Sequence, residues 1–270
     1  MNDRYGAMFE GLRAKNEGAF GAFVMLGDPD LEGSAAILDA LVEGGADMLE
    51  VGIPFSDPVA DGPTIQAAAD RALARKVTPA DCFALLKAVR ARHPHVPVGV
   101  LTYANIVLAR GRDAFYAAAA DAGVDSVLVA EAPVFEAEPI VRTARDHGIA
   151  PVLIAATNTP EPTLKRMAEL GQGYTYCVAR AGVTGAETEM AFDHGALLGA
   201  LARFGAPPAV LGFGISRPDH VRAALAGGAA GVISGSAIVR LIEREGADAA
   251  PAIRDFVAEM KAATRKSELL

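Results

Sequence analysis

Two carboxylate side chains, those of Glu50 and Asp61, occupy positions in which they could take part in acid–base chemistry. In residues 47–53 the large apolar residues Leu49, Val51 and Ile53 share one parity, so Glu50 falls on the opposite face of an expected strand. If the apolar face packs against helices, Glu50 points into a closed barrel, where lost hydration raises a carboxyl pKa. Such a group suits a general acid or base near neutral pH. The alternative is a Glu50 side chain that is ion-paired to a buried arginine.

A second acid, Asp61, lies in the loop after this strand, about ten residues beyond Glu50. Prolines at 54, 58 and 63 stiffen the loop, which is long enough to fold the Asp61 carboxylate back over the barrel mouth. Two other interpretations stay open here. Asp61 could cap a helix that begins near Pro63, and Asp57 could be an Asx-turn residue.

Glycine-rich segments at 182–185, 212–216 and 234–237 follow the last three apolar runs of the chain. In barrels, the loops after the seventh and eighth strands form phosphate sites from backbone N–H groups, and glycine permits the close approach. Each segment alone would indicate only a turn. Together they predict that the ligand is a small phosphate ester.

Other chemistries lack their signatures. The chain has no GxxxxGK[ST], GxGxxG, GxSxG or HExxH sequence. The lysines and histidines fall away from the expected strand ends, so we expect neither a Schiff base nor a metal site, and no cofactor. With 25 Lys plus Arg against 33 Asp plus Glu, the net charge of −8 argues against nucleic acid as a partner.

The location expected from the sequence is the cytoplasm. Cys82 and Cys177 are far apart and form no CxxC motif, which is typical of a reducing compartment. The N-terminal residues 1–15 lack the apolar core of a signal peptide. The apolar stretches are far shorter than the ~20 residues of a transmembrane helix, so no membrane association is expected.

The elements that would position these residues alternate along the chain. Short, almost wholly apolar runs indicate parallel strands buried on both faces, and amphipathic stretches of helical length separate them. The repeat predicts an α/β fold, a (β/α)8 TIM barrel, as one domain over residues 1–270, with an extra N-terminal helix at 4–15 that plugs the barrel bottom. The expected strands are 19–26, 47–53, 97–102, 126–130, 151–155, 174–179, 209–213 and 231–234, and examples of expected helices are 33–43, 79–92, 114–121, 161–170, 194–204 and 218–226.

Two connections are longer than a barrel requires, at 54–80 and 180–193. Both follow the carboxyl end of an expected strand, which is the face where barrel enzymes carry their active sites. Long loops at this face often act as lids. We therefore expect the function to depend on these two segments.

Residues 49–66, LEVGIPFSDPVADGPTIQ, closely resemble the signature of the tryptophan synthase alpha subunit family. The resemblance continues in order through LGDP at 26–29, YAN at 103–105, GVDSVLVA at 123–130, RAGVTG at 180–185, GFGIS at 212–216 and SGSA at 234–237. It therefore covers nearly the whole chain.

The resemblance implies a retro-aldol cleavage of indole-3-glycerol phosphate to indole and glyceraldehyde 3-phosphate. It implies that Glu50 is the general acid/base that protonates indole C3, and that Asp61 accepts a hydrogen bond from the indole N–H and stabilises the developing cation. Thr184 would close over the site towards Asp61. The remaining residues implied to bind substrate are Gly185, Gly214, Gly235 and Ser236 around the phosphate, and Phe23, Leu101, Leu128, Tyr176 and Phe213 around the indole.

By the same resemblance the chain docks on a pyridoxal-phosphate beta subunit in an alpha2beta2 hetero-tetramer, and the loop at 54–63 contributes to that interface. The sequence departs from the family pattern at Met25, Glu131 and Ala179, where Thr, Asp and Ser are usual. None of these removes a catalytic group. Two alternatives remain: a stand-alone indole-3-glycerol-phosphate lyase of the same family, or an inactive barrel scaffold that only activates a beta subunit.

Overall fold

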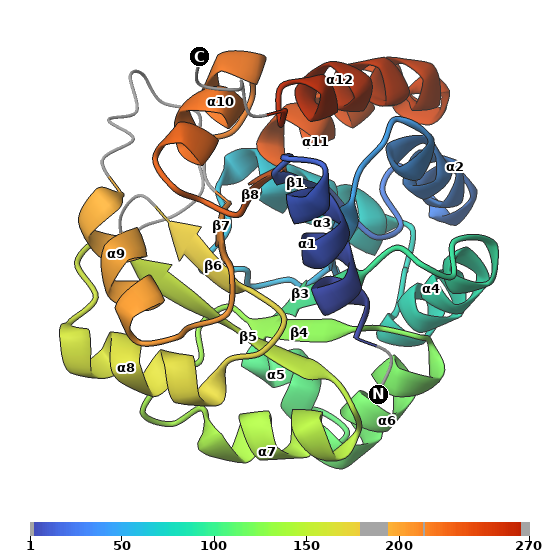
Figure 1. Cartoon of the computed structure of the whole chain (residues 1–270). Helices are drawn as coiled ribbons and strands as arrows, with labels where there is room; N and C mark the ends of the chain where they lie inside the picture. Colours follow the sequence, from blue (N-terminus) through green and yellow to red (C-terminus); the bar gives the residue numbers. More distant parts are fainter. Residues whose placement is uncertain (1–2, 179–193, 213, 266–270) are drawn as a thin grey trace.

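Eight parallel strands close into a barrel in chain order, each hydrogen-bonded to the next and β8 to β1 (Figure 1). The computed structural model describes residues 3–178, 194–212 and 214–265. The strands are β1 (Ala19–Met25), β2 (Met48–Gly52), β3 (Val98–Thr102), β4 (Ser126–Val129), β5 (Ala150–Ala156), β6 (Thr175–Val178), β7 (Ala209–Leu211) and β8 (Gly231–Ser234). The predicted (β/α)8 barrel is confirmed, and the boundaries of its strands differ from the expected ones by at most two residues.

Alternation along each strand divides the apolar core into two clusters. On β2, Leu49 and Val51 belong to the cluster between the strands and the outer helices, together with Ile53 just beyond the strand. Met48 belongs to the cluster inside the barrel. Because Glu50 shares the parity of Met48, its side chain also points inward, as the sequence predicts.

The helices surround the barrel, as Figure 1 shows. Their starts carry the expected signals: α4, for example, begins with a capping box between Thr78 and Asp81 and has Pro79 in its first turn. The helices are α1 (Arg4–Ala14), α2 (Leu31–Glu43), α3 (Pro63–Ala74), α4 (Pro79–Arg92), α5 (Ala104–Leu108), α6 (Arg112–Asp121), α7 (Glu138–Asp146), α8 (Glu161–Leu170), α9 (Gly195–Arg203), α10 (Pro218–Ala226), α11 (Ser236–Glu245) and α12 (Ala250–Ala262), with a short 3-10 turn η1 (Gly246–Asp248).

The same glycine motif ends three of these helices. Gly45, Gly123 and Gly228 all have a positive φ, which costs glycine little because it has no Cβ. In each case the following amide also bonds back to the helix, as in Ala46 N to Leu41 O at 3.0 Å. This is the Schellman pattern, and it turns the chain directly into β2, β4 and β8.

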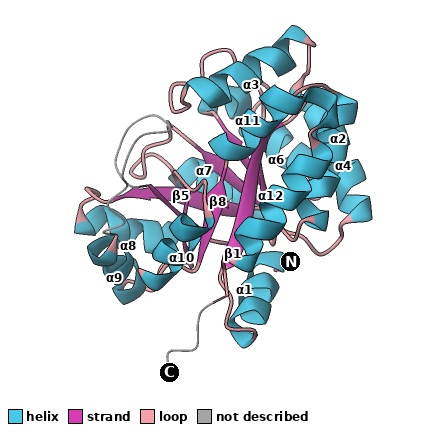
Figure 2. Ribbon diagram, turned by 90° about the horizontal axis from the view of Figure 1, so that it is seen from above, coloured by secondary structure: helices cyan, strands magenta, loops and turns pink. Residues whose placement is uncertain are grey.

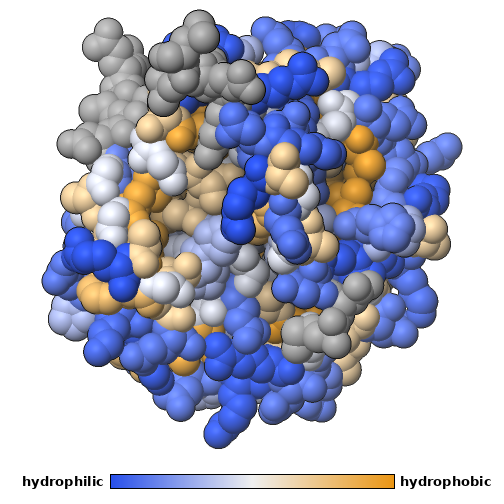
Figure 3. Space-filling model, in the orientation of Figure 1, coloured by the Kyte–Doolittle hydropathy of each residue, from blue (hydrophilic) through white to orange (hydrophobic). Residues whose placement is uncertain are grey.

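Helix α1 covers the end of the barrel where the strands begin, as predicted. Figure 2 shows it at that end, opposite α3. Its buried residues Tyr5, Phe9 and Leu12 join the cluster inside the barrel. Arg4 anchors it through an ion pair of 2.7 Å to Asp125, which precedes β4. Seen from the side that α1 covers, most of the surface is hydrophilic (Figure 3).

The two connections expected to be long differ in outcome. Much of 54–80 is the helix α3, so the irregular part after β2 is confined to residues 53–62. The first connection is therefore long because it contains an additional helix, which begins at Pro63, near where the capping interpretation of Asp61 placed one. The second connection, 180–193, lies outside the described residues.

In the part of the chain that the structure describes, no helix is both long and apolar enough to cross a membrane.

Candidate active site

Glu50 lies in the middle of β2, inside the barrel, with 2% of its surface exposed. Tyr174 donates a hydrogen bond of 2.6 Å from its hydroxyl to Oε1 of Glu50. Oε2 is buried and has no hydrogen-bond partner among the described residues. Burial raises the pKa of Glu50 to about 7; the Tyr174 hydrogen bond opposes this rise, and the negative charge of Asp61 adds to it. The partner of Glu50 is thus a tyrosine and not the buried arginine considered as an alternative.

Asp61 is also buried, with 6% of its surface exposed, although it lies in a loop. A turn places it there, since its amide donates to Pro58 O at 3.0 Å, and Gln66 Nε2 donates to its carbonyl at 2.6 Å. The Tyr103 hydroxyl hydrogen-bonds the carboxylate. Burial raises the pKa of Asp61 to about 6, and the bond to Tyr103 opposes the rise.

The helix-capping interpretation of Asp61 is wrong. The N-cap of α3 is Gly62, and within the described part of the chain no side chain makes a capping hydrogen bond there. The Asp61 carboxylate is therefore directed elsewhere. Its charge acts on Glu50 and on Tyr176, and the Glu50 charge acts on Tyr176 as well, so the two acids and this ring share one region of the barrel.

Phe23 connects the acids to the glycine segments. It pairs with Glu50 in the register of β1 and β2. A Cβ atom built on Gly235 would lie 3.3 Å from Cβ of Phe23, and one built on Gly52 would lie 3.0 Å from its Cζ. The side chain therefore spans the distance from the β2 end to the β8 end. A molecule the size of a sugar phosphate could bridge the same distance.

Other expected indole-binding residues also face the barrel interior. Leu128 and Tyr176 are buried in the inner cluster, and the half-buried Leu101 packs against that cluster. The Tyr176 hydroxyl donates to Gly212 O at 2.7 Å, which ties β6 to the segment after β7. All three side chains therefore lie on the inner side of the barrel, on the same side as Glu50.

The described part of the glycine cradle comes from two neighbouring strand ends. Gly235 is the N-cap of α11, and Ser236 is its first residue. Gly214, with a φ of +72°, lies in the loop after β7. The Ser234 hydroxyl donates to Ile215 O at 2.6 Å and holds this loop against the end of β8. The first amides of α11 lack acceptors within the helix, and such a terminus attracts anions.

Several expectations fall outside the described residues: Thr184, Gly185 and Phe213, and also the departure at Ala179. The other two departures have clear positions. Met25 Cε would lie 2.9 Å from a Cβ on Gly52, so the Met25 side chain fills space above that glycine. Glu131 Oε1 accepts the Ala104 amide at 2.7 Å, at the start of α5.

Sequence reasoning did not single out two tyrosines as partners of the acids, Tyr174 for Glu50 and Tyr103 for Asp61. Tyr174 also packs against Tyr5, with ring centroids 5.4 Å apart, and the Tyr5 hydroxyl bonds Ser126 Oγ at 2.8 Å. A sequence signal existed for Tyr174, because it is the first residue of the strand expected at 174–179. Among residues 3–178, 194–212 and 214–265, no three His, Cys, Asp or Glu side chains gather as metal ligands would.

A (β/α)8 barrel with two buried, mutually interacting carboxyls and a glycine-lined helix terminus defines an acid–base enzyme for a phosphorylated substrate. Comparison with known proteins shows to which family of such enzymes the chain belongs. The family model for the tryptophan synthase alpha chain matches residues 9–267. The alpha chain of Aeromonas salmonicida is 55% identical over 265 residues, 97% of this chain and 99% of its own length. That of Escherichia coli is 52% identical over 266 residues, 97% and 99% of the two chains. The chain belongs to the tryptophan synthase alpha chain family.

Comparison with solved structures leads to the same family. Tryptophan synthase of Mycobacterium tuberculosis superposes with a TM-score of 0.88 at 31% identity, over 98% of this chain and 99% of that one. A structure of the tryptophan synthase a2b2 complex of Pyrococcus furiosus superposes with a TM-score of 0.85 at 37% identity, over 92% and 99%. The family's reaction is the cleavage of indole-3-glycerol phosphate, which makes it a carbon–carbon lyase.

Proposed function

We propose that Glu50 and Asp61 carry out the cleavage of indole-3-glycerol phosphate in this chain, as general acid/base and as electrostatic stabiliser. The observation that carries the proposal is the buried Glu50 carboxyl. Its pKa of about 7 keeps a large fraction protonated at neutral pH, and its Oε2 has no partner among the described residues. A carboxyl in this state can give a proton and take one back.

The proposed reaction begins when protonated Glu50 transfers its proton to indole C3. The positive charge that develops spreads to the ring nitrogen, whose N–H donates to the Asp61 carboxylate. The bond between C3 and the glycerol carbon then breaks, and its electron pair returns to the ring. The glycerol hydroxyl loses its proton to the Glu50 carboxylate and becomes the aldehyde of glyceraldehyde 3-phosphate. Asp61 acts on charge that exists only after proton transfer, so it stabilises the transition state more than the substrate.

The substrate's two ends are assigned to different strand ends. We assign the phosphate to the backbone at Gly214, Gly235 and Ser236, together with Gly185, which the structure does not describe. Because α11 begins there, its partial positive charge supports a dianion without a lysine. The indole is assigned to the space among the other side chains, which are Phe23, Leu101, Leu128, Tyr176 and Phe213, with Thr184 as a closing residue.

The beta chain is the proposed partner, in an alpha2beta2 complex like that of Pyrococcus furiosus. Exposed apolar side chains follow three adjacent strands of this barrel: Val59 after β2, Leu108 in α5 after β3, and Phe135 after β4. Phe135 is 83% exposed. Large apolar residues that gather on one face of a protein are typical of an interface. They extend the interface beyond the loop at 54–63 that the sequence predicted.

The cytoplasm is the proposed location, and the free, buried thiols of Cys82 and Cys177 support it, because reducing compartments leave cysteines unpaired. A single domain over residues 1–270 is the proposed organisation, since one strand order closes one barrel.

The function is tested by adding indole-3-glycerol phosphate to the purified chain, with and without a beta chain, and following indole. We expect slow release by the chain alone and faster release in the complex. A chain that is equally active alone would be a stand-alone lyase. A chain that releases no indole under either condition, yet raises the activity of the beta chain, would be a scaffold.

Tyr174→Phe tests the hydrogen bond that holds Glu50. This bond lowers the pKa of Glu50 against the larger effect of burial, so its loss should raise that pKa further. The pH dependence of kcat/KM for indole release should shift towards alkaline pH. An unchanged profile would mean that Tyr174 does not act on the carboxyl during catalysis.

Gly212→Ala tests the close approach of β7 to Tyr176. A Cβ atom at this position would overlap the Tyr176 ring. We expect the unfolding free energy in urea to fall by about 1–3 kcal/mol, and KM to rise as the ring moves. Gly199→Ala is the matched control, because among the described residues no atom outside its own helix lies within 4 Å of its Cβ position. This substitution should raise stability by about 0.5–1 kcal/mol in a helix. Equal effects of the two changes would contradict the steric explanation.

Phe135→Asp tests the proposed interface. A charge at the centre of an apolar contact should weaken association with the beta chain by at least about tenfold, as measured by titration calorimetry. Indole release by the isolated chain should stay unchanged. Ala258→Asp, on the exposed side of α12, is the control and should not alter association. Equal loss in both variants would place the interface elsewhere.

A further inference from the structure

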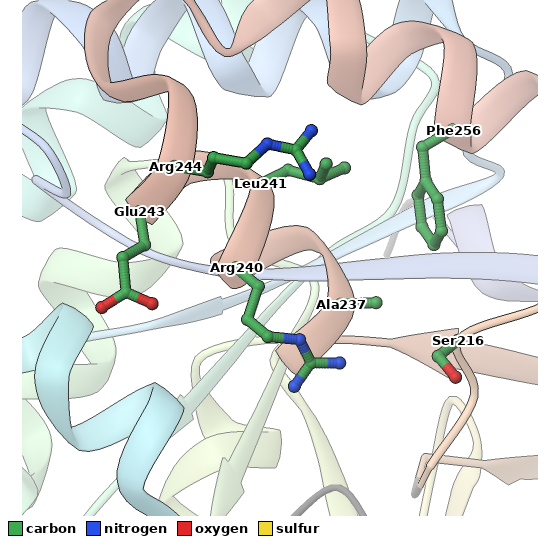
Figure 4. Close-up of a pocket in the computed structure, with 7 residues that line it drawn as sticks. All are labelled: Ser216, Ala237, Arg240, Leu241, Glu243, Arg244 and Phe256. Atoms are coloured by element: carbon green, nitrogen blue, oxygen red, sulfur yellow. The ribbon is translucent and has the colours of Figure 1, made fainter.

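A hollow of about 440 Å³ lies on the outer side of α11, away from the two acids. It is bounded by α11, by Phe256 of α12 and by Ser216 of the loop after β7 (Figure 4). Its volume falls in the range of small-molecule sites. The lining residues are Ser216, Ala237, Arg240, Leu241, Glu243, Arg244 and Phe256.

The hollow carries positive charge that the protein itself does not neutralise. Arg240 and Arg244 are one turn apart and lie on the same face of α11. Arg240 is half-buried, and its guanidinium makes no hydrogen bond or ion pair with any other side chain in the described part of the chain. Among the described residues, Arg244 forms an ion pair with the exposed Glu245, at 2.6 Å, and such surface pairs are weak.

Glu243, the acidic residue of the lining, does not neutralise the positive charge of Arg240 and Arg244. Figure 4 shows the Glu243 carboxylate directed away from the two guanidinium groups. On that side it lies 3.5 Å from Arg71 of α3. The charge of Glu243 is therefore shared with α3, and the open side of the hollow retains its positive character.

The opposite wall is apolar. Phe256 extends from α12 towards the hollow, and Leu241 and Ala237 lie between it and the guanidinium groups (Figure 4). The ring and the cation are thus on different sides of one space. A ligand that satisfies both would have a charged group at one end and an apolar ring at the other.

We propose that this hollow binds a small aromatic anion, with its charged group on Arg240 and its ring against Phe256 and Leu241. A carboxylate and a phosphate monoester both match a guanidinium fork. The hollow is separate from the substrate site, because its lining holds neither acid and none of the cradle residues Gly214, Gly235 and Ser236.

The two sites nevertheless share structural elements. Ser216 is two residues from Gly214, and Ala237 directly follows Ser236. An anion in the hollow would repel a phosphate in the cradle, so each ligand should weaken the other by the same limited factor. This coupling, unlike the binding itself, rests on the proposed function of the cradle.

The probes for binding are phenylacetate, a carboxylate, and phenyl phosphate, measured by titration calorimetry on the full chain. Inorganic phosphate and benzyl alcohol provide the charge and the ring alone and should bind more weakly. Arg240→Ala should weaken phenylacetate at least about tenfold. Phe256→Leu, which keeps the site apolar, should weaken it less. Arg222→Ala, an exposed arginine of α10 outside the hollow, is the matched control and should bind as the parent does.

Glycerol 3-phosphate, a phosphate without a ring, separates the two sites. If phenylacetate binds in the hollow, rising glycerol 3-phosphate should leave its Kd unchanged or raise it to a plateau. If phenylacetate binds in the substrate site, its Kd should rise in proportion without limit, and to the same extent in Arg240→Ala, which removes any competition at the guanidinium of the hollow. That result, or a wild-type Kd in Arg240→Ala, would overturn the proposal. Absence of indole release by the parent chain would instead refute the proposed function and leave the binding result standing.

Discussion

Glu50→Gln should abolish indole release, with a fall in kcat of at least about a thousandfold, because the amide cannot give a proton to C3 or accept one afterwards. The amide has nearly the shape of the carboxyl, so Tyr174 can still donate to its oxygen. Binding of the phosphate ester should stay within about threefold of the parent value, because the cradle lies at other strand ends. Single-turnover release of indole and calorimetric titration measure the two quantities.

The control for this substitution is Asp57→Asn, which removes an exposed carboxylate from the loop after β2. Measured on the isolated chain, it should release indole at close to the parent rate. Retention of more than roughly a tenth of the parent rate in Glu50→Gln would contradict the acid/base role. A comparable loss in Asp57→Asn would mean that the whole loop is sensitive to charge.

The same substitution should stabilise the fold at alkaline pH. The pKa of Glu50 rises from an ordinary 4.5 to about 7 on folding, chiefly because of burial. Between these values the folded state binds more protons than the unfolded state, so stability falls as pH rises through the window. Above pH 7 the ionised carboxyl costs about 3 kcal/mol, which glutamine avoids. Urea unfolding should show Glu50→Gln more stable than the parent at pH 8 and equal to it at pH 4.

The sequence predicted the structure correctly wherever the spacing of apolar residues along the chain determined it. Strands covered on both faces are short apolar runs, and the parity of Leu49, Val51 and Ile53 correctly placed Glu50 inside the barrel. The continuation of α3 beyond Pro63 was less visible. Its buried residues Ile65, Ala68, Ala69 and Ala72 do recur at helical spacing, but three of the four are alanines, whose weak hydrophobicity makes the pattern hard to recognise.

The hydrogen-bond partners of Glu50 and Asp61 could not be predicted from a local sequence pattern. Tyr174 and Glu50 are 124 residues apart, and only closure of the barrel brings β6 opposite β2. The choice between an arginine and a tyrosine as the partner of Glu50 therefore depended on tertiary structure. The same holds for Tyr103 and Asp61, whose contact requires the loop after β2 to fold over the end of β3.

Asp61→Asn should reduce kcat far more than it weakens substrate binding. The asparagine oxygen can still accept the indole N–H, so KM should change by less than about threefold. It carries no charge, however, and cannot stabilise the cation that forms after proton transfer. Loss of a comparable electrostatic group costs about a hundredfold to a thousandfold in kcat.

Stability provides the second readout for this substitution. Burial raises the pKa of Asp61 from 3.8 to about 6, so the ionised form is disfavoured in the folded state, and stability falls as pH rises through that window. Asparagine should therefore unfold at the same or a higher urea concentration than the parent at pH 8. Equal losses in kcat and in binding, together with lower stability, would make Asp61 a structural residue. A loss confined to kcat in a fold at least as stable would leave charge stabilisation as its role, because geometry and packing would both be intact.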